Sequence, residues 1–301
     1  MAEYVTKIRT NEGDKQIDYN ALANLPEISN PNLLINSDFR NPVNQRGETS
    51  YTFNGAGVAY TIDRWCINYH STLIVNDGYV TLQGNVDSNN YWYQPLEHAM
   101  TGTFTISVYV KSITNTNGYM GCYTVDDNNG EYRRFTLREG LNVITFNATN
   151  LNRIGFVAYK TGTVADIEWI KLEQSNVATS FTPRLYAEEL MLCRRYYQTI
   201  ELARLDVLCY LHHRNTDEYG GFIRVQPMRT TPTVTRTGYF FVEKYNSNGV
   251  HSVNENELQH LHFVPQFSGL KIGVGLSTQD TVNYLAVGSD SATIGFDAEI
   301  Y

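Results

Sequence analysis

Short runs of β-branched and aromatic residues alternate with clusters of Gly, Asn and Asp along most of this chain, and this pattern constrains the fold more than any other feature. The clearest run places an apolar residue at every second position: Phe104, Ile106, Val108 and Val110. Successive side chains of a β-strand point to opposite faces, so these four are predicted to face a core. The residues between them are predicted to face water.

Similar strands are predicted throughout residues 33–172, separated by turns such as Asp77-Gly78 and Asn129-Gly130. They cover 60–69, 79–83, 132–137, 142–148, 153–159 and 165–172. About eight strands within about 140 residues are typical of a jelly-roll β-sandwich. The first thirty residues lack apolar periodicity and are predicted to form an arm outside this core.

The periodicity changes after Pro183, where Leu190, Cys193, Tyr197 and Ile200 recur at helical spacing. Acidic residues precede basic ones along this stretch, which is the order that the helix dipole favours. Alternation then returns in runs at 207–211, 222–225, 232–237, 260–264, 270–276 and 292–296, which indicates a second, smaller β domain. The predicted fold is mainly β, with an N-terminal attachment arm (1–30), a jelly-roll domain (31–185), a connecting helix (186–204) and a C-terminal β tip domain (205–301).

Charge and hydropathy limit the classes of partner. The formal net charge of −8 and the lack of any Lys/Arg cluster argue against nucleic acid. Nothing near Met1 is typical of a secretory signal, and no stretch approaches the roughly 18 apolar residues of a membrane-spanning helix, so no membrane insertion is expected. The cysteines lack the spacing of a zinc site or a disulfide framework and are expected to be buried free thiols. They are Cys66, Cys122, Cys193 and Cys209.

Several motifs resemble, in order, a module of receptor-binding proteins in bacteriophage tail fibres and baseplates. They lie at 32–40 (NLLINSDFR), 44–47 (NQRG), 63–65 (DRW), 171–173 (KLE), 178–184 (ATSFTPR), 188–197 (EELMLCRRYY), 227–234 (PMRTTPTV) and 296–299 (FDAE). The resemblance covers nearly all of residues 32–301. It implies a jelly roll like that of carbohydrate-binding modules, a homotrimer, and a place in the virion tail after synthesis in the cytoplasm of the bacterial host.

The resemblance also implies a function in host recognition and adhesion. The expected partners are a bacterial surface polysaccharide or other cell-wall glycan, further copies of the chain, and other tail or baseplate proteins held through the N-terminal arm. Related carbohydrate-binding modules often hold a structural calcium with an acidic residue just after Phe39, where this chain has Arg40. A structural connector without a receptor site remains an alternative.

Catalytic motifs are missing from the sequence: there is no GxSxG, no HExxH, no P-loop and no dinucleotide-binding fingerprint. The chain is therefore not expected to be an enzyme. A pair of glycosidase carboxylates comes together only in the folded protein, so a tail-associated glycan depolymerase stays open as a second alternative.

An aromatic run that follows the polar stretch 87–90 is the best candidate for a glycan site. Alternation along a strand places at least one ring of this run on the face opposite its neighbours, where it is expected to meet water. Further tyrosines and a polar loop at 126–130 are of the same chemical kind. The candidate glycan-binding residues are Tyr91, Trp92, Tyr93, Tyr119, Tyr123 and Asn128. The alternative is an ordinary hairpin with a solvated turn.

Two other clusters have an ordinary interpretation beside a functional one. Trp65 lies in a strand pattern and is predicted to anchor the core, with Asp63 and Arg64 as a structural pair, although the three also suit a sugar site. The acidic turn at 126–131 suits calcium only in part, because it lacks the remaining spacing of an EF-hand.

His260 and His262 occupy one face of a predicted strand, two residues apart. In a trimer, three such pairs would supply six nitrogens around the axis, which makes them candidate ligands of a transition metal. Two partly exposed strand histidines are the commoner arrangement. No other cofactor is expected.

Overall fold

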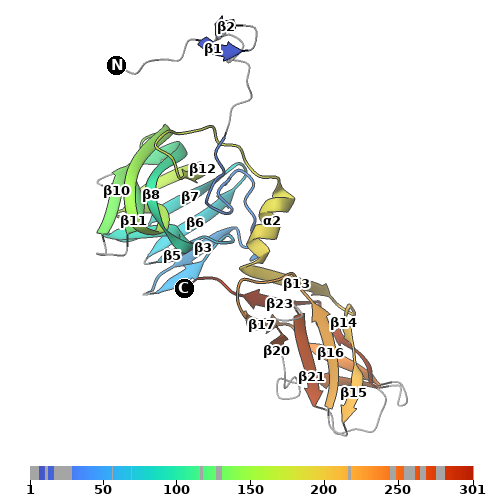
Figure 1. The fold of residues 1–301 in the computed structure, drawn as a ribbon. Coiled ribbons are helices and arrows are strands. Elements are labelled where there is room, and N and C mark those ends of the chain that lie inside the picture. The colour runs from blue at the N-terminus through green and yellow to red at the C-terminus, as the bar shows by residue number, and fades with distance from the viewer. Residues whose placement is uncertain are drawn as a thin grey trace.

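A computed structural model of the 301-residue chain describes residues 7–10, 13–16, 29–55, 57–68, 70–115, 118–126, 131–215, 218–244, 249–253, 262–264, 269–275 and 282–300. A hairpin of β1 (Lys7–Thr10) and β2 (Gly13–Gln16) precedes a β-sandwich, and a second β domain follows it (Figure 1). The fold is thus mainly β, as the sequence predicts. In the described part of the chain, no helix has the length and apolar character needed to cross a membrane.

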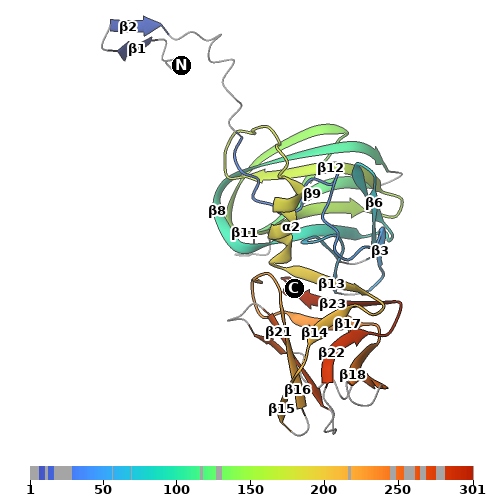
Figure 2. The same ribbon diagram turned by 90° about the vertical axis from the view of Figure 1, so that its right-hand side faces the viewer.

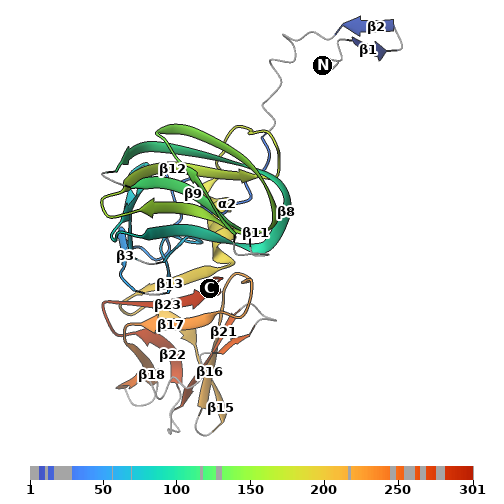
Figure 3. The same ribbon diagram turned by 90° about the vertical axis from the view of Figure 1, so that its left-hand side faces the viewer.

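Ten antiparallel strands build the sandwich. They are β3 (Ser50–Phe53), β4 (Val58–Tyr60), β5 (Cys66–Asn68), β6 (Ser71–Asn76), β7 (Tyr79–Gly84), β8 (Asn89–Thr114), β9 (Tyr119–Asp126), β10 (Glu131–Thr136), β11 (Gly140–Tyr159) and β12 (Val164–Glu173). The long strands β8 and β11 belong to both layers, because their pairing is interrupted by register shifts between Ala148 and Arg153 (Figure 3). One layer contains β3, β6, β7, β12 and the ends of β8 and β11 that pair near Phe104; the other contains β4, β5, β9, β10 and the opposite ends of β8 and β11.

The core lies between these layers. Phe104, Ile106, Val108 and Val110 are completely buried, which confirms the predicted inward face. The opposite face is wet only in part, because Thr105 is also buried. Its hydroxyl donates to the carbonyl of Ser175 at 2.8 Å, so the segment after β12 covers this end of the strand.

The first resemblance motif contains no regular strand and is fixed by asparagine side chains. Asn32 Oδ1 accepts the backbone N–H of Leu172 at 3.0 Å, which ties the motif to β12. Asn36, in the left-handed region at φ 54°, donates to the carbonyls of Val43 and Asp63 at 2.8 Å each. Left-handed backbone favours Gly, Asn and Asp, which explains an asparagine here.

The connecting helix is shorter than predicted. Helix α2 spans Tyr186–Arg194, and the residues after it form strand β13 (Tyr197–Ala203), which pairs with β23 (Ser291–Asp297). The prediction of a helix over 186–204 is therefore wrong beyond Arg194. Over so short a stretch, helical spacing of apolar residues is compatible with a helix or with a strand. Residues 197–203 form a strand because they pair with β23 near the end of the chain. Glu189 holds α2 on the sandwich by accepting the N–H of Asn36 at 2.6 Å.

The C-terminal domain consists of three small sheets packed around their own core (Figure 2). Besides β13 and β23 its strands are β14 (Val207–Tyr210), β15 (His212–Asn215), β16 (Glu218–Arg224), β17 (Thr233–Thr237), β18 (Phe240–Lys244), β19 (Gly249–Val253), β20 (His262–Val264), β21 (Gly269–Gly275) and β22 (Val282–Val287). Phe240, Val242 and Phe296 are among its buried side chains. All four cysteines of the chain are free and buried, as expected.

Candidate functional site

One outward face of the sandwich is rich in tyrosine. It lies on the layer formed by β5, β8, β11, β9 and β10, and we call it the tyrosine face. Its members are Tyr91, Tyr93, Tyr119, Tyr123, Arg134, Arg153 and Tyr159. Because side chains alternate along β8, Trp92 points into the core while Tyr91 and Tyr93 point outward. Four of the six predicted glycan-binding residues therefore share one surface.

Register places the tyrosines in adjacent rows. Tyr93, Gly155 and Tyr123 are opposite one another on three neighbouring strands. A Cβ at Gly155 would come within 2.5 Å of Tyr93 Cα, so glycine lets the two rings meet above it. The rings of Tyr93 and Tyr123 lie 6.0 Å apart edge to face, and Tyr91 lies 4.7 Å from Tyr123. The result is a continuous aromatic layer rather than isolated rings.

Arg134 of β10 joins two of these tyrosines at the surface. Its Nη2 donates to the hydroxyl of Tyr91 at 2.9 Å, and its Nη1 donates to the hydroxyl of Tyr119 at 3.4 Å. The arginine is exposed, whereas both tyrosines are half-buried. A guanidinium and two phenol oxygens thus meet at one point that solvent reaches.

Burial divides the predicted residues into accessible and inaccessible ones. Tyr93 and Tyr123 are only 3% and 2% exposed, and burial raises the pKa of the Tyr123 hydroxyl. Trp92 is completely buried, donates its indole N–H to Thr61 at 3.0 Å and lies 4.6 Å from Trp65. Its assignment as a glycan-binding residue is therefore wrong: it is a core residue. Asn128 lies outside the described residues.

Two amide oxygens on the same side of the sheet accept no hydrogen bond among the described residues. Asn68 pairs with Tyr91, and Asn89 pairs with Tyr159, so both side chains belong to the rows of the tyrosine face. Each Oδ1 is buried, although both residues are half-buried as a whole. An unsatisfied acceptor of this kind is destabilising by about 1–3 kcal/mol, and a hydroxyl donor from a ligand would relieve it.

A second aromatic group lies on the opposite layer and was not predicted. Trp169 of β12 stacks on Phe181 with ring centres 4.5 Å apart and ring planes 2° apart. Tyr109 of β8 is opposite Trp169, and Arg40 lies 5.6 Å from the centre of Phe181. Phe181 stacks on Trp169, and Arg40 lies over Phe181, so the stack fastens the segment after β12 to the sheet.

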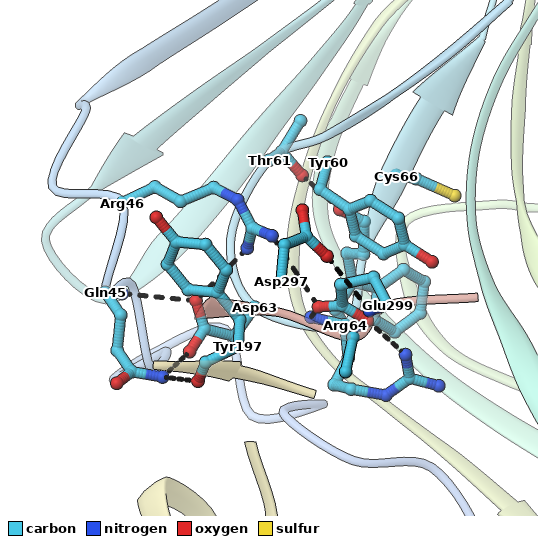
Figure 4. A network of polar contacts seen from close by, with 12 residues as sticks. Gln45, Arg46, Tyr60, Thr61, Asp63, Arg64, Cys66, Tyr197, Asp297 and Glu299 are labelled. Atoms are coloured by element: carbon cyan, nitrogen blue, oxygen red, sulfur yellow. Dashed lines mark hydrogen bonds and ion pairs between the residues drawn. The ribbon is translucent and has the colours of Figure 1, made fainter. Parts of the chain in front are cut away.

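The DRW motif is part of a buried polar network at the junction of the two domains (Figure 4). Arg64 donates through Nη1 to Glu299 at 2.5 Å and lies 3.6 Å from the centre of the Tyr196 ring. Asp63 instead accepts from Gln45 Nε2 at 2.6 Å. Trp65 is a core anchor as predicted, but Asp63 and Arg64 are not a pair with each other: they bind different partners.

Burial governs the ionisation of this network. It raises the pKa of Asp63 to about 7, although the positive charge of Arg46 acts to lower this pKa. It also raises the pKa of Glu299, which Arg64 and Arg46 oppose. Arg46 contacts both carboxylates, at 3.4 Å and 3.7 Å. These contacts connect the sandwich to the last residues of the chain.

The side chains of the two predicted metal ligands lie outside the described part of the structure. His260 lies outside the described residues, and so does most of the acidic turn after Asp126. His262 begins β20, but its side chain is not among those described. Within the described residues, no group of three or more His, Cys, Asp or Glu side chains is placed to hold a metal ion.

Comparison with known proteins finds weak likenesses of fold. No protein-family model and no curated sequence matches the chain. One similar structure is a mutant family 29 carbohydrate-binding module, 12% identical over 46% of this chain and 100% of the module, with a TM-score of 0.29. A family 11 module from Clostridium thermocellum, in complex with a β-1,3-1,4-mixed-linked tetrasaccharide, is 15% identical over 42% of this chain and 88% of its own, with a TM-score of 0.25.

A tandem of two family 22 carbohydrate-binding modules from Paenibacillus barcinonensis covers more of the chain. It is 11% identical over 90% of this chain and 98% of its own, with a TM-score of 0.29. Likenesses at these identities and TM-scores establish neither a shared ligand nor a shared site.

Proposed function

We propose that this chain is an adhesion protein that binds bacterial surface glycan through the tyrosine face, as part of a bacteriophage tail or a tail-like particle. The observation that carries the proposal is the meeting of Arg134 with the hydroxyls of Tyr91 and Tyr119 at an exposed point. The half-buried rings offer flat apolar surface to sugar C–H groups, and the guanidinium and phenols offer hydrogen bonds to sugar hydroxyls.

Rigidity of the face supports binding as well. The Tyr91 ring packs against buried Tyr123, and the Tyr119 ring stacks on Tyr159, so little side-chain freedom remains to be lost when a ligand binds. Weak binding at one such face is strengthened when several copies act together, because linked sites raise avidity far above the affinity of one. A trimer, which the sequence resemblance implies, would present three faces.

The place in a tail rests on the sequence resemblance. The motif residues have structural roles: Asn32 and Asn36 fix the first segment, while Arg64 and Glu299 join the domains. The resemblance therefore concerns the scaffold, and none of the motif residues belongs to the tyrosine face. Antibodies against the chain should label the tails of particles from its producing cells, and labelling elsewhere would contradict this part of the proposal.

For the depolymerase alternative, Asp63 and Glu299 are two carboxylates that share Arg46. Both side chains are completely buried, and their hydrogen bonds go to the protein itself. A glycosidase pair must flank a sugar and admit water, and these two carboxylates meet neither requirement. Adhesion without cleavage is the function that the tyrosine face favours.

A binding screen against whole bacterial cells and isolated surface glycans tests the proposal. The double variant Tyr91→Ala/Tyr119→Ala should lose binding, while its melting temperature should stay close to that of the wild type. Tyr210→Ala is the matched control, since Tyr210 is 78% exposed in the C-terminal domain and far from the face in sequence. Binding that survives the double variant, or sugar release from the glycan, would contradict the proposal.

A further inference from the structure

The two arginines of the tyrosine face differ from several others of this chain in their partners. Five arginines lie within 4 Å of a carboxylate: Arg40, Arg46, Arg64, Arg184 and Arg195. Arg134 and Arg153 have no carboxylate partner among the described residues, and both contact tyrosines. No described carboxylate compensates their charges, although the formal net charge of the chain is −8.

Arg134 is held in place by acceptors that leave its charge intact. The hydroxyls of Tyr91 and Tyr119 receive one N–H from each of its two terminal nitrogens. A guanidinium has five N–H groups in a planar fork, so others remain for a ligand. Phenol oxygens are neutral, and the exposed fork is oriented without being neutralised. Such a fork matches the two oxygens of a carboxylate or phosphate.

Arg153 supplies a second positive charge on the same face. Its guanidinium carbon lies 5.5 Å from the centre of the Tyr93 ring, and it is half-buried on β11. Arg153 is opposite Val125, while Arg134 is opposite Tyr123, two residues further along β9. Two strand spacings and two residues place the two Cα atoms about 12 Å apart. One chain-like ligand can therefore meet both cations at different points.

We infer that the ligand of the tyrosine face is an acidic glycan, whose carboxylate or phosphate group Arg134 binds while Arg153 attracts a further charge of the same chain. This inference rests on the proposed function and names the class of glycan. The hydroxyl of Tyr119 donates to no partner among the described residues. It can therefore donate a further hydrogen bond to an oxygen of the carboxylate or phosphate group. Neutral polysaccharides would leave both arginines without a counter-ion.

The inference has a quantitative consequence for Arg134. A hydrogen bond to a charged group is stronger than a neutral one, so Arg134→Gln should weaken binding of an acidic glycan about 10- to 100-fold. Arg134→Lys keeps the charge but loses the fork, and should restore only part of the affinity. Binding should also weaken as salt is raised from 0.05 to about 0.5 M, because exposed charges are screened.

The test is calorimetry on the full-length chain with matched probes. Polygalacturonate and its methyl ester share a backbone but differ in charge, and a poly(glycerol phosphate) polymer tests phosphate as the source of the anion. Arg138→Gln is the control, because Arg138 is an exposed arginine of the same domain outside the face. Arg134 is exposed, so its variants should keep the melting temperature of the wild type.

The outcomes separate the inference from the proposed function. Binding of either anionic polymer that falls with Arg134→Gln but not with Arg138→Gln supports the inference, and the responding polymer identifies carboxylate or phosphate. Binding of neutral glycan at the same affinity, unchanged in Arg134→Gln, overturns the inference and leaves glycan adhesion standing. If neither probe, nor any surface glycan of the cell screen, binds at all, both are overturned.

Discussion

Removing the carboxylate of Glu299 should weaken the junction between the two domains. Glu299 and Arg64 meet at 2.5 Å, and their side chains are 0% and 1% exposed. The backbone N–H of Arg64 also donates to Glu299, at 3.1 Å. In Glu299→Gln the Arg64 guanidinium keeps its charge and burial but loses its counter-ion. The charge then lies in a medium that solvates it poorly.

The size of the effect follows from burial. Removing one partner of a buried ion pair typically destabilises a protein by about 3–5 kcal/mol, because the other charge is left uncompensated. Glutamine still accepts one hydrogen bond, so about 3 kcal/mol is expected. Separation of the C-terminal domain from the sandwich would let water reach Arg64, and the free energy of that separation is an upper limit to the loss of stability. The exposed pair Asp38–Arg40 meets at nearly the same distance, 2.6 Å, with side chains 23% and 40% exposed. Asp38→Asn should therefore reduce stability by about 0–1 kcal/mol only.

Urea unfolding followed by tryptophan fluorescence measures both variants. The chain has three tryptophans, and all of them, Trp65, Trp92 and Trp169, lie in the sandwich, which also contains Arg64. The midpoint of the transition should fall clearly for Glu299→Gln and hardly at all for Asp38→Asn, with the slope of the transition unchanged. Equal losses in the two variants would refute the reasoning that burial, rather than ion-pair distance, sets the energy.

Three further predictions follow from the same contacts. Burial raises the pKa of Asp63 from 3.8 to about 7, so the folded state binds the proton of this carboxyl more tightly than the unfolded state does. The contribution of this proton to the free energy of unfolding is present in full below pH 3.8. It is lost as the pH rises through about 7, and it amounts to about 4 kcal/mol at most. In Asp63→Asn this part of the pH dependence of unfolding should vanish. Trp65→Ala and Trp92→Ala should each lower the free energy of unfolding by about 3–5 kcal/mol, since both rings are completely buried; a stable Trp92→Ala protein would contradict this. Light scattering should give a particle of three chains, each of 34.3 kDa, and a mass of one chain would exclude the trimer.

Alternation of apolar residues predicted much of the sandwich, because each strand must place its own apolar side chains on the face that is buried. The strand at 79–83 is found as Tyr79–Gly84, and the inward face of Phe104 is found as predicted. The predicted strands at 142–148 and 153–159 proved to be one strand, Gly140–Tyr159, which changes layers at its bulge. Nothing local distinguishes a bend within a strand from a turn between two strands.

Long-range pairing explains the errors elsewhere. Residues 197–203 resemble a helix in spacing but pair with residues 291–297 at the other end of the chain. Asp63 and Arg64 are neighbours in sequence, yet Arg64 binds Glu299, 235 positions later, and Asp63 binds Gln45. Partners that only the complete fold brings together leave no trace in the spacing of one segment.

Only part of the tyrosine face was predicted from the sequence: four of its seven residues were among the candidates. Alternation predicts that the run at 91–93 has residues on both faces of the sheet, but it does not show which face is inside. Trp92 therefore stood among the candidates although it is a core residue. Arg134 was missed, although its strand was predicted, because its place beside Tyr91 depends on the order of strands in the sheet. Strand order is a property of the whole domain.

Different residues of this chain form the scaffold and the tyrosine face. Asn36, Arg64 and Glu299, which belong to the resemblance motifs, are buried and fix the fold. Tyr119 is half-buried and Arg134 is exposed, and both lie outside those motifs. Substitution of an accessible residue away from buried networks usually changes stability by less than about 0.5 kcal/mol. Substitution of the exposed Arg134 is therefore expected to leave the junction of the two domains intact.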